Sequence, residues 1–384
     1  MTTPTRTWTF LAHTLEQVGP PVFLLHLLRW LHDEPAIRLE VVALAGGALL
    51  PAFEALGSVA IVGDPGQPSE RSDSGRPTGV GRLALPDGTP ERSLIYVNTA
   101  ASVRALPAID GGPAGPDIPL IAHIHELEVG LSYHLDDDER FRLLAAKGIV
   151  AASQAVAENL ISRHGVDADR IKVHHEFIAI NETPPVQTAP SIRASLGIPA
   201  SSFVVGTAAV VNWRKGTDLF LQVALRLARR RPDLDVHHVW IGGREDEQDT
   251  MRFDADISAA GLADQVHLTP FVDRPLDWMR TFDLFALTAR EDAYPIAGLE
   301  AASIGLPIIC FASGGIPEFV ESDAGVVVEF GDVDGMVAAI AGLADDPGRR
   351  EQLGRRAAAK VRERHEVGRV APALVADLKR WEGR

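Results

Sequence analysis

Short apolar runs alternate with longer segments of helical period along almost the whole chain of 384 residues. This alternation is typical of parallel sheets covered by helices. In the first half the predicted strands are residues 8–12, 38–44, 59–62, 94–98, 119–125 and 148–153. In the second half they are residues 202–210, 236–243, 265–270, 284–288, 306–312 and 325–330. We therefore predict an α/β fold built from two similar, doubly wound, Rossmann-like halves.

The predicted helices lie between these strands and include residues 20–32 and about 215–231, with Pro20 suited to a first helical turn. Two stretches interrupt the rhythm. Residues 63–92 are rich in Gly, Pro and Ser and are interpreted as a flexible surface insertion. Residues 183–199 are rich in proline and show no regular period, which indicates an interdomain linker.

These interruptions divide the chain into two expected domains, because 384 residues are long for one core. Residues 1–182 form the first domain and residues 200–363 the second. Residues 364–384 are expected to form a C-terminal helix that packs back on the first domain. Ligands of such sheets bind at the carboxyl ends of the strands, so we expect the site between two sheets that face each other across a cleft.

The formal net charge of -15 excludes a nucleic-acid partner, because phosphate backbones are bound by basic surfaces. Without a polybasic patch, membrane contact is expected to be peripheral at most. No apolar run reaches the roughly 18 residues of a membrane span, and the N-terminus lacks the layout of a signal peptide. The single cysteine, Cys310, makes no disulfide framework. We expect a cytoplasmic protein.

The stretch "REDAYPIAGLEAASIGLPIICFASGGIPEFV" carries the first candidate chemistry. A predicted helix begins near Pro295, and the free N–H groups of a helix start bind anions such as phosphate. Asp292 lies just before this helix and Glu300 about two turns into it. They are either ligand-binding acids or an N-capping aspartate and a solvated glutamate. The apolar neighbours of Glu300 favour the first interpretation.

A second anion site is predicted where Arg214 and Lys215 precede the helix that begins near residue 217. Two cations at a helix start oppose the helix dipole, unless a diphosphate binds both. The alternative is that both are solvated surface side chains.

In the first half, "HIHELE" ends a strand, and His125 beside Glu126 is an acid/base pair, an oriented donor or a core histidine. His123 and His125 form an H-x-H pair, but the sequence presents no third ligand, and no metal is expected. Gly19, in the turn after the first strand, would let backbone approach a ligand closely.

These motifs together resemble the retaining glycosyltransferases of family 4, which have the GT-B architecture. The resemblance rests on the glycine turn, "HIHE", "AASQAVAENLISRHGVDADRIKV", "RKGTDLFL", "WIGG" and the E-x7-E-like element with its following "AASIGLPIICFASGGIPEFV". It implies transfer of a sugar from a nucleotide diphosphate donor with retention of configuration, without cofactor or metal.

The resemblance also implies roles for single residues. Glu300 would bond the donor ribose, and Asp292 would contact the transferred sugar. The diphosphate would meet the backbone of Ile296 and Ala297, the side chains of Arg214 and Lys215, and Gly19 from the other domain. His125 would lie beside the reacting sugar, and Phe271 and Val272 would border the base.

Two positions depart from the family pattern. The family has glutamate where this chain has Asp292, and many members have arginine where this chain has Ala209. Both departures put the identity of the donor sugar in doubt.

The predicted function is a hexosyl transfer from a UDP- or GDP-sugar to a glycan, a lipid-linked acceptor or a small molecule. One alternative is a sugar-nucleotide hydrolase or epimerase of the same fold. The other is a degenerate protein that binds the nucleotide sugar without turnover. The sequence leaves the oligomeric state open.

Overall fold

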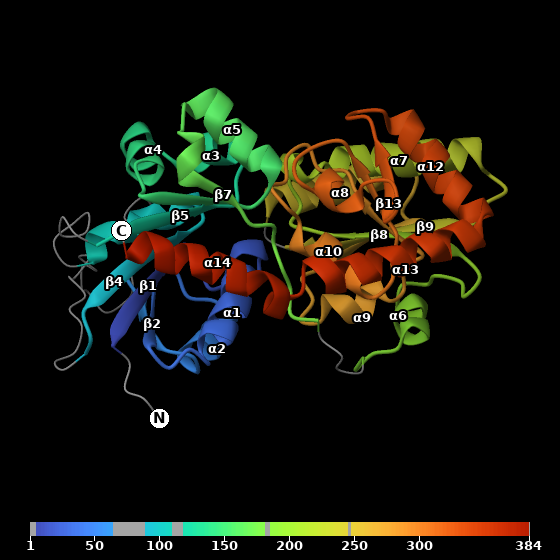
Figure 1. Ribbon diagram of the computed structural model, residues 1–384. Helices are drawn as coiled ribbons and strands as arrows, with labels where there is room; N and C mark the ends of the chain where they lie inside the picture. Colours follow the sequence, from blue (N-terminus) through green and yellow to red (C-terminus); the bar gives the residue numbers. More distant parts are fainter. Residues whose placement is uncertain (1–4, 64–88, 110–117, 181–184, 245–246, 384) are drawn as a thin grey trace. The chain divides into compact units, whose positions relative to one another are not determined.

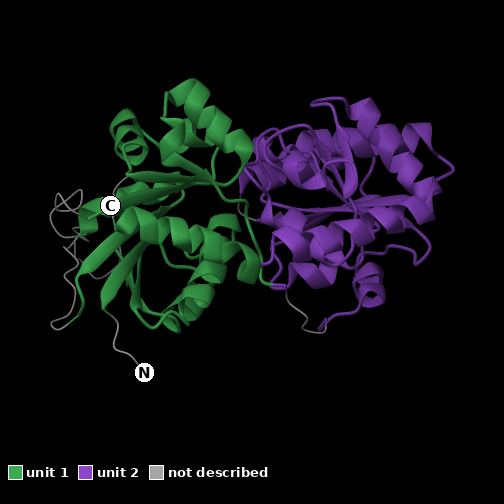
Figure 2. Ribbon diagram, in the orientation of Figure 1, with its two compact units in different colours: residues 1–179, 367–384 green, residues 180–366 purple. Residues whose placement is uncertain are grey.

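The computed structural model describes residues 5–63, 89–109, 118–180, 185–244 and 247–383. Most of the predicted insertion at 63–92 lies outside these residues. The chain divides into two compact units: unit 1 comprises residues 1–179 and 367–384, and unit 2 comprises residues 180–366 (Figure 2).

The described part of unit 1 holds a seven-stranded parallel sheet in the order β3-β2-β1-β4-β5-β6-β7 (Figure 1). Its strands are β1 (Arg6–Ala12), β2 (Ile37–Ala43), β3 (Ser58–Ile61), β4 (Arg92–Asn98), β5 (Leu120–Ile124), β6 (Gly148–Ala151) and β7 (Ile171–Val173). Its helices are α1 (Gly19–Leu31), α2 (Leu50–Glu54), α3 (Glu128–His134), α4 (Asp137–Leu144), α5 (Gln154–His164) and α14 (Val367–Glu382), with 3-10 turns η1 (Ala100–Ala108) and η2 (Ala168–Arg170).

Unit 2 holds a six-stranded parallel sheet in the order β10-β9-β8-β11-β12-β13 within its described residues. Its strands are β8 (Phe203–Ala208), β9 (Val236–Gly243), β10 (Val266–Pro270), β11 (Leu284–Leu287), β12 (Ile308–Phe311) and β13 (Gly325–Val328). Its helices are α6 (Ala189–Ser195), α7 (Thr217–Arg230), α8 (Gln248–Ala259), α9 (Pro275–Met279), α10 (Ile296–Ser303), α11 (Ile316–Val320), α12 (Val333–Asp345) and α13 (Pro347–Arg364), with the 3-10 turn η3 (Trp213–Lys215).

The sequence pattern succeeds because these sheets are covered on both faces. Strands buried on both sides become continuous apolar runs, and β9 is buried along its whole length. The fold prediction of two doubly wound parallel α/β domains is confirmed for each unit. The pattern missed β7, which has three residues and exposes Lys172 in its middle.

The segment 183–199, expected to be a linker, differs from that expectation. Its described residues include the short helix α6, which packs against α9 in unit 2. Thr188 caps α6 by accepting from the backbone N–H of Ser191. Arg193 of α6 also donates to the carbonyl of Thr281, so this segment is part of the domain.

The C-terminal helix α14 lies beside α1 in unit 1 (Figure 1). The indole of Trp381 packs so closely on Gly148 of β6 that a Cβ at this glycine would fall 2.3 Å from the ring. Asp377 bonds His174 beside β7, and Glu382 accepts from the indole N–H of Trp8 on β1. Three strands of the sheet are thereby tied to the end of the chain.

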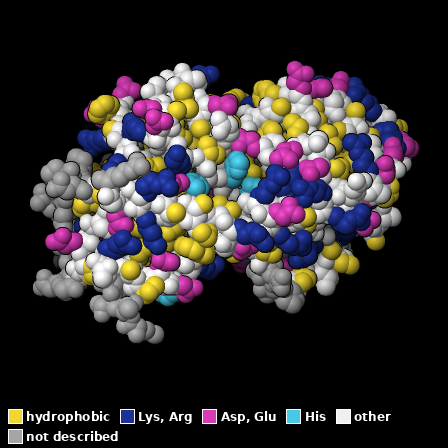
Figure 3. All heavy atoms as spheres, viewed as in Figure 1, with side chains coloured by type: hydrophobic (Ala, Val, Ile, Leu, Met, Phe, Trp, Pro, Cys, Tyr) yellow, Lys and Arg dark blue, Asp and Glu magenta, His cyan; other side chains and the backbone are white. Residues whose placement is uncertain are grey.

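The surface mixes charges of both signs. On the face shown in Figure 3, acidic and basic side chains lie interspersed over each unit. Within the described residues, we find no helix with the length and apolar character needed to cross a membrane.

We expect Trp381→Ala to lower the free energy of unfolding of unit 1 by about 3 to 5 kcal/mol, because a buried indole would leave a cavity against Gly148. Urea unfolding followed by circular dichroism measures this change. Arg369→Ala, at an exposed position of the same helix, is the matched control and should stay within about 0.5 kcal/mol of the parent. Equal stability of the two variants would contradict the assigned role of α14.

Candidate functional site

The strand order of each sheet reverses at one point. In unit 2 this point lies between β8 and β11, and in unit 1 between β1 and β4. Loops that leave neighbouring strands in opposite directions at such a point open a crevice at the carboxyl edge, where ligands of doubly wound sheets bind. Most predicted site residues of unit 2 lie on or next to these loops, whereas in unit 1 Gly19 follows β1 and His125 follows β5. Each unit is described in turn.

The two loops of unit 2 are joined through Arg214. Its guanidinium donates from Nη1 to the carbonyl of Glu291 at 2.8 Å, and its own carbonyl accepts from the N–H of Arg290 at 2.8 Å. Beside it, the ammonium of Lys215 donates to Asp292 Oδ2. The structure therefore brings Arg214, Lys215 and Asp292 together, although 77 positions separate Lys215 from Asp292 in the chain.

Glycine permits this approach. Gly216 has φ +71° and lies so close to Thr288 that a Cβ would fall 2.0 Å from the Thr288 carbonyl oxygen. Gly314 has φ +66°, and its Cβ would fall 1.9 Å from the carbonyl oxygen of Asp292. This carbonyl also accepts from the N–H of Gly315. The double glycine after β12 thus holds the backbone of Asp292.

The pair of Lys215 and Asp292 is mostly enclosed, with 17% of the lysine side chain and 12% of the aspartate side chain exposed. Burial is the main cause that lowers the pKa of Lys215, and the neighbouring Arg214 lowers it further, while Asp292 opposes both. The interpretation of Lys215 as a solvated side chain is wrong. Asp292 is also not the N-cap of α10, a position that Pro295 occupies.

Helix α10 begins at Ile296, and no side-chain cap bonds its first turn in the described residues. The N–H groups at Ile296 and Ala297 therefore keep the character of an anion site. Glu300 is half-buried on the same helix, and burial raises its pKa to about 7. This carboxyl can donate as well as accept near neutral pH.

The remaining predicted positions of unit 2 lie at the carboxyl ends of β8 and β10. Phe271 follows β10, and its backbone N–H donates to the carbonyl of Gly243. The residue is 42% exposed, and the guanidinium of Arg244 lies over its ring. Val272 beside it is half-buried. Ala209, where an arginine was expected, accepts the indole N–H of Trp240 at its carbonyl. Its side chain supplies no charge.

In unit 1, Gly19 begins α1, and a Cβ there would meet open space. The carbonyl of the next residue, Pro20, accepts from the amide of Asn98, the last residue of β4. The other end of this amide lies 3.1 Å from His125 Nε2. Asn98 thus connects Pro20, in the first turn of α1, to His125. The sequence analysis missed Asn98, although it ends a strand at the reversal point.

The carboxylate partner of the His125 ring is Glu176 rather than its neighbour Glu126. Nδ1 of His125 lies 2.5 Å from Glu176 Oε1. Glu126 instead accepts from the hydroxyl of Thr99 and the N–H of Ala100, where Thr99 has φ +91°. Glu126 therefore holds a strained turn at the end of β4. Nothing in the sequence near Glu176 indicated its role.

The sequence presented no third metal ligand beside His123 and His125, but the structure places one there. Glu176 offers one, because the ligand atoms of the three side chains lie within 4.8 Å of one another. His123 already pairs through Nδ1 with the hydroxyl of Tyr96, and its pKa is lowered well below the usual value by burial and by the charge of His125.

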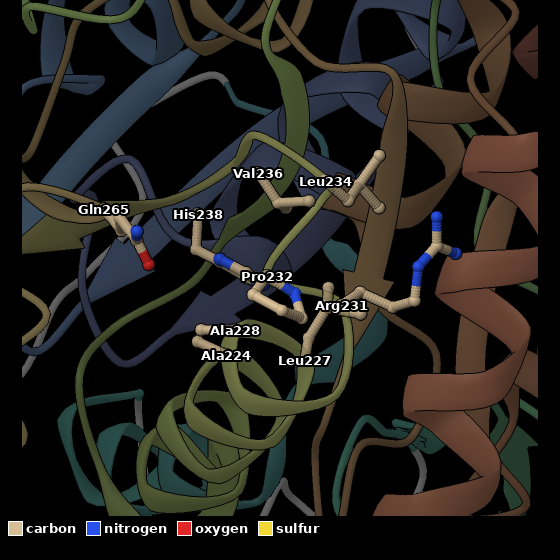
Figure 4. Close-up of a pocket in the computed structure, with 9 residues that line it drawn as sticks. All are labelled: Ala224, Leu227, Ala228, Arg231, Pro232, Leu234, Val236, His238 and Gln265. Atoms are coloured by element: carbon tan, nitrogen blue, oxygen red, sulfur yellow. The ribbon is translucent and has the colours of Figure 1, made fainter.

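A separate pocket lies at the other edge of the sheet of unit 2, where Ala224, Leu227 and Ala228 of α7 line it (Figure 4). His238 points into it, while Arg231 extends away from it. Burial lowers the pKa of His238 to about 3, which keeps its imidazole neutral. None of the predicted site residues lies in this pocket, because Val236 and Gln265 mark the amino ends of β9 and β10.

Part of unit 2 resembles a known protein family. Residues 188–360 match the family described as glycosyl transferases group 1. The match covers fewer than half of the 384 residues and lies within unit 2, which resembles the group 1 glycosyl transferases. The matched range contains Arg214, Lys215, Asp292 and Glu300, together with both loops at the reversal point of unit 2.

Proteins similar to this chain include a D-inositol 3-phosphate glycosyltransferase of an Arthrobacter species, 29% identical over 58% of this chain and 53% of the relative. A lipopolysaccharide core mannosyltransferase, LpsB of Rhizobium meliloti, is 27% identical over 61% of this chain and 64% of its own. The chain spans about half the length of the first curated relatives it matches.

The solved structure of Anabaena HepE in complex with UDP-glucose shares the fold of this chain. Its TM-score is 0.78 at 21% identity, over 97% of this chain and 99% of HepE. The sucrose-phosphate synthase of Thermosynechococcus elongatus has a TM-score of 0.70 over 98% of each chain, at 16% identity. The GT-B fold class predicted from the sequence is confirmed.

We expect Gly314→Ala to lower the free energy of unfolding of unit 2 by at least about 2 kcal/mol, because a methyl group would collide with the Asp292 backbone at a positive φ. Gly342→Ala is the matched control, since a Cβ at this helical glycine meets open space, and it should stabilise by up to about 1 kcal/mol. Denaturant unfolding of both variants tests the difference, and a loss of the same size in each would refute the close approach.

Stability should also depend on the protonation of Glu300. Its folded pKa of about 7 lies above the usual 4.5, so the stability linked to its proton is complete below pH 4.5 and is lost as pH rises through 7. Glu300→Gln lacks this loss. The difference in free energy of unfolding between Glu300→Gln and the parent should therefore shift by roughly 1 to 2 kcal/mol in favour of the variant from pH 5 to pH 8. Chemical denaturation at both pH values measures the gain. The exposed Glu329→Gln should keep the parent's pH dependence.

Proposed function

We propose that this protein is a retaining glycosyltransferase that moves a sugar from a nucleotide diphosphate donor to a glycan, lipid-linked or small-molecule acceptor. The observation that carries the proposal is the arrangement of Arg214, Lys215 and Asp292 on the two loops at the strand reversal of unit 2. The family match, the names of the relatives and the UDP-glucose bound to HepE support the same class of reaction.

In this proposal the diphosphate binds the N–H groups at Ile296 and Ala297 and the cations of Arg214 and Lys215. Positive charge at this place stabilises the negative charge that develops on the leaving diphosphate. Glu300 bonds the ribose hydroxyls, Asp292 the transferred sugar, and Phe271 and Val272 border the base. The resemblance assigns Gly19 to the diphosphate and His125 to the reacting sugar. The leaving phosphate accepts the proton of the acceptor hydroxyl, so the reaction needs no further base.

The Lys215–Asp292 pair adds a constraint. The ammonium that would bind the diphosphate is held by the carboxylate that would bind the sugar. A donor therefore has to replace that bond with one to phosphate, and the released carboxylate can then accept from a sugar hydroxyl. UDP lacks the transferred sugar and therefore offers Asp292 no hydroxyl of that sugar.

We expect a thermal-shift screen with UDP, GDP, ADP and dTDP, alone and as sugars, to raise the melting temperature with at least one nucleotide. Lys215→Ala should weaken binding of that nucleotide diphosphate roughly 10- to 100-fold in calorimetry, because one charge-assisted contact is lost. Asp292→Asn should bind it at least as tightly as the parent, since it frees Lys215, but should turn over the nucleotide sugar more slowly.

The control is Arg226→Ala, which removes an exposed cation of α7 that pairs with Asp334 and should leave nucleotide affinity unchanged. No thermal shift with any of the nucleotides would overturn the proposal. Release of free sugar or an epimerised donor in the absence of acceptor would favour a hydrolase or epimerase instead. Binding without turnover over panels of donors and acceptors would indicate a degenerate binding protein.

A further inference from the structure

The imidazole of His125 is enclosed in unit 1, with 4% of its side chain exposed. It lies against the ring of Phe23 of α1, 5.4 Å between centroids, and 3.8 Å from the ring of His123. Both of its nitrogens have hydrogen-bond partners, Glu176 at Nδ1 and Asn98 at Nε2. The protonation state of the ring follows from the direction of these two bonds.

Asn98 decides the direction at Nε2. Its amide nitrogen lies 3.0 Å from the carbonyl oxygen of Pro20, an atom that only accepts. The end of the amide that faces His125 is therefore its oxygen, which also only accepts. Nε2 must carry a hydrogen to bond it. The carboxylate of Glu176 accepts at the other nitrogen, Nδ1, and an imidazole that donates from both nitrogens is the imidazolium cation.

The surroundings favour this cation. Burial lowers the pKa of His125, whereas the carboxylate of Glu176 and, to a smaller extent, that of Glu126 raise it. The carboxylates outweigh burial, so the pKa of His125 is raised above its usual value. Glu126 also accepts from the backbone N–H of His125 at 3.0 Å. The neighbouring ring of His123 stays neutral, because burial and the positive charge of His125 both lower its pKa.

The cation lies beside a second source of positive potential. The amide of Asn98 joins His125 to Pro20 in the first turn of α1, a helix of 13 residues. The partial positive charge of the helix start and the imidazolium thus occur on the same edge of the sheet, at its strand reversal. A histidine held in this state cannot act as a general base, since neither nitrogen has a lone pair.

We propose that Glu176 is a positioning residue that keeps His125 as a fixed imidazolium at the start of α1, where its charge stabilises the anionic donor. This inference rests on the proposed glycosyl transfer. A charge that is in place before the reaction needs no reorganisation when negative charge develops on the leaving group. Glu176 acts through His125 and itself touches no substrate in this account.

The test is nuclear magnetic resonance of the full chain labelled with 15N at histidine, with His125→Gln to assign the ring signals. We expect both His125 nitrogens of the parent to be protonated at pH 7.5. In Glu176→Gln one of them should lose its proton, and Glu176→Asp should restore it at least in part. Glu128→Gln is the matched control, because Glu128 pairs with His164 elsewhere in unit 1 at 2.9 Å, and it should leave His125 unchanged.

A neutral His125 in the parent, or an imidazolium that persists in Glu176→Gln, would overturn the inference. A second test adds one equivalent of Zn²⁺ to the parent and to His123→Gln. If Zn²⁺ removes the ring protons of His125 in the parent but not in His123→Gln, the inference is also overturned, because His123, His125 and Glu176 would then form a metal site. These measurements need no substrate, so they succeed or fail independently of the proposed function.

Turnover tests the functional half. We expect Glu176→Gln to lower kcat at least about tenfold with a smaller change in donor KM, and Glu176→Asp to recover part of the loss. The parent's rate should fall as pH rises through the folded pKa of His125, and this step should move to lower pH in Glu176→Gln. A kcat of Glu176→Gln equal to the parent's, with His125 neutral, would refute the positioning role.

Discussion

The site of unit 2 depends on close backbone contacts between the loops that follow β8, β11 and β12. A glycine at Gly216 lets the turn after β8 lie against Thr288, and a glycine at Gly314 lets the turn after β12 lie against Asp292. Any side chain at either position would collide with a carbonyl oxygen rather than with a movable group. The positions of Lys215 and Asp292 are therefore determined by contacts of the main chain.

Rigid backbone also explains how an enclosed ammonium and carboxylate are tolerated. Removing two charges from water costs several kcal/mol per ion, and their attraction offsets this only when the geometry is good. Here the loop is further held by Arg290, which bonds both oxygens of Asp218 and lies 4.9 Å from the ring of Trp213. Each partner of the pair retains some exposure through which a ligand can approach.

The strands of unit 2 were predictable from sequence, because strands buried on both faces are continuous apolar runs. The loop before α10 was predictable because Asp292, Ile296, Ala297 and Glu300 lie within nine consecutive residues. Contacts between distant residues were not. Glu176 pairs with His125 across 51 positions, and Asn98 reaches it across 27. Adjacency in sequence favoured Glu126, whose carboxylate is instead used to hold the strained turn at Thr99. No local sequence pattern distinguishes a carboxylate that accepts hydrogen bonds from a turn, such as Glu126, from one that pairs with a histidine ring, such as Glu176.

The shorter acid at position 292 gains a physical meaning from this geometry. Its backbone is clamped by Gly314 and Gly315, so its carboxylate reaches only as far as its single methylene allows, and it reaches Lys215. A sugar hydroxyl and the ammonium thus compete for the same oxygens. In the proposed reaction the strength of the Lys215–Asp292 bond opposes every donor equally, whereas the bond from the sugar to Asp292 differs among donors. Discrimination between sugars then arises only after the diphosphate has drawn Lys215 away, which makes donor choice depend on the order in which the two contacts form.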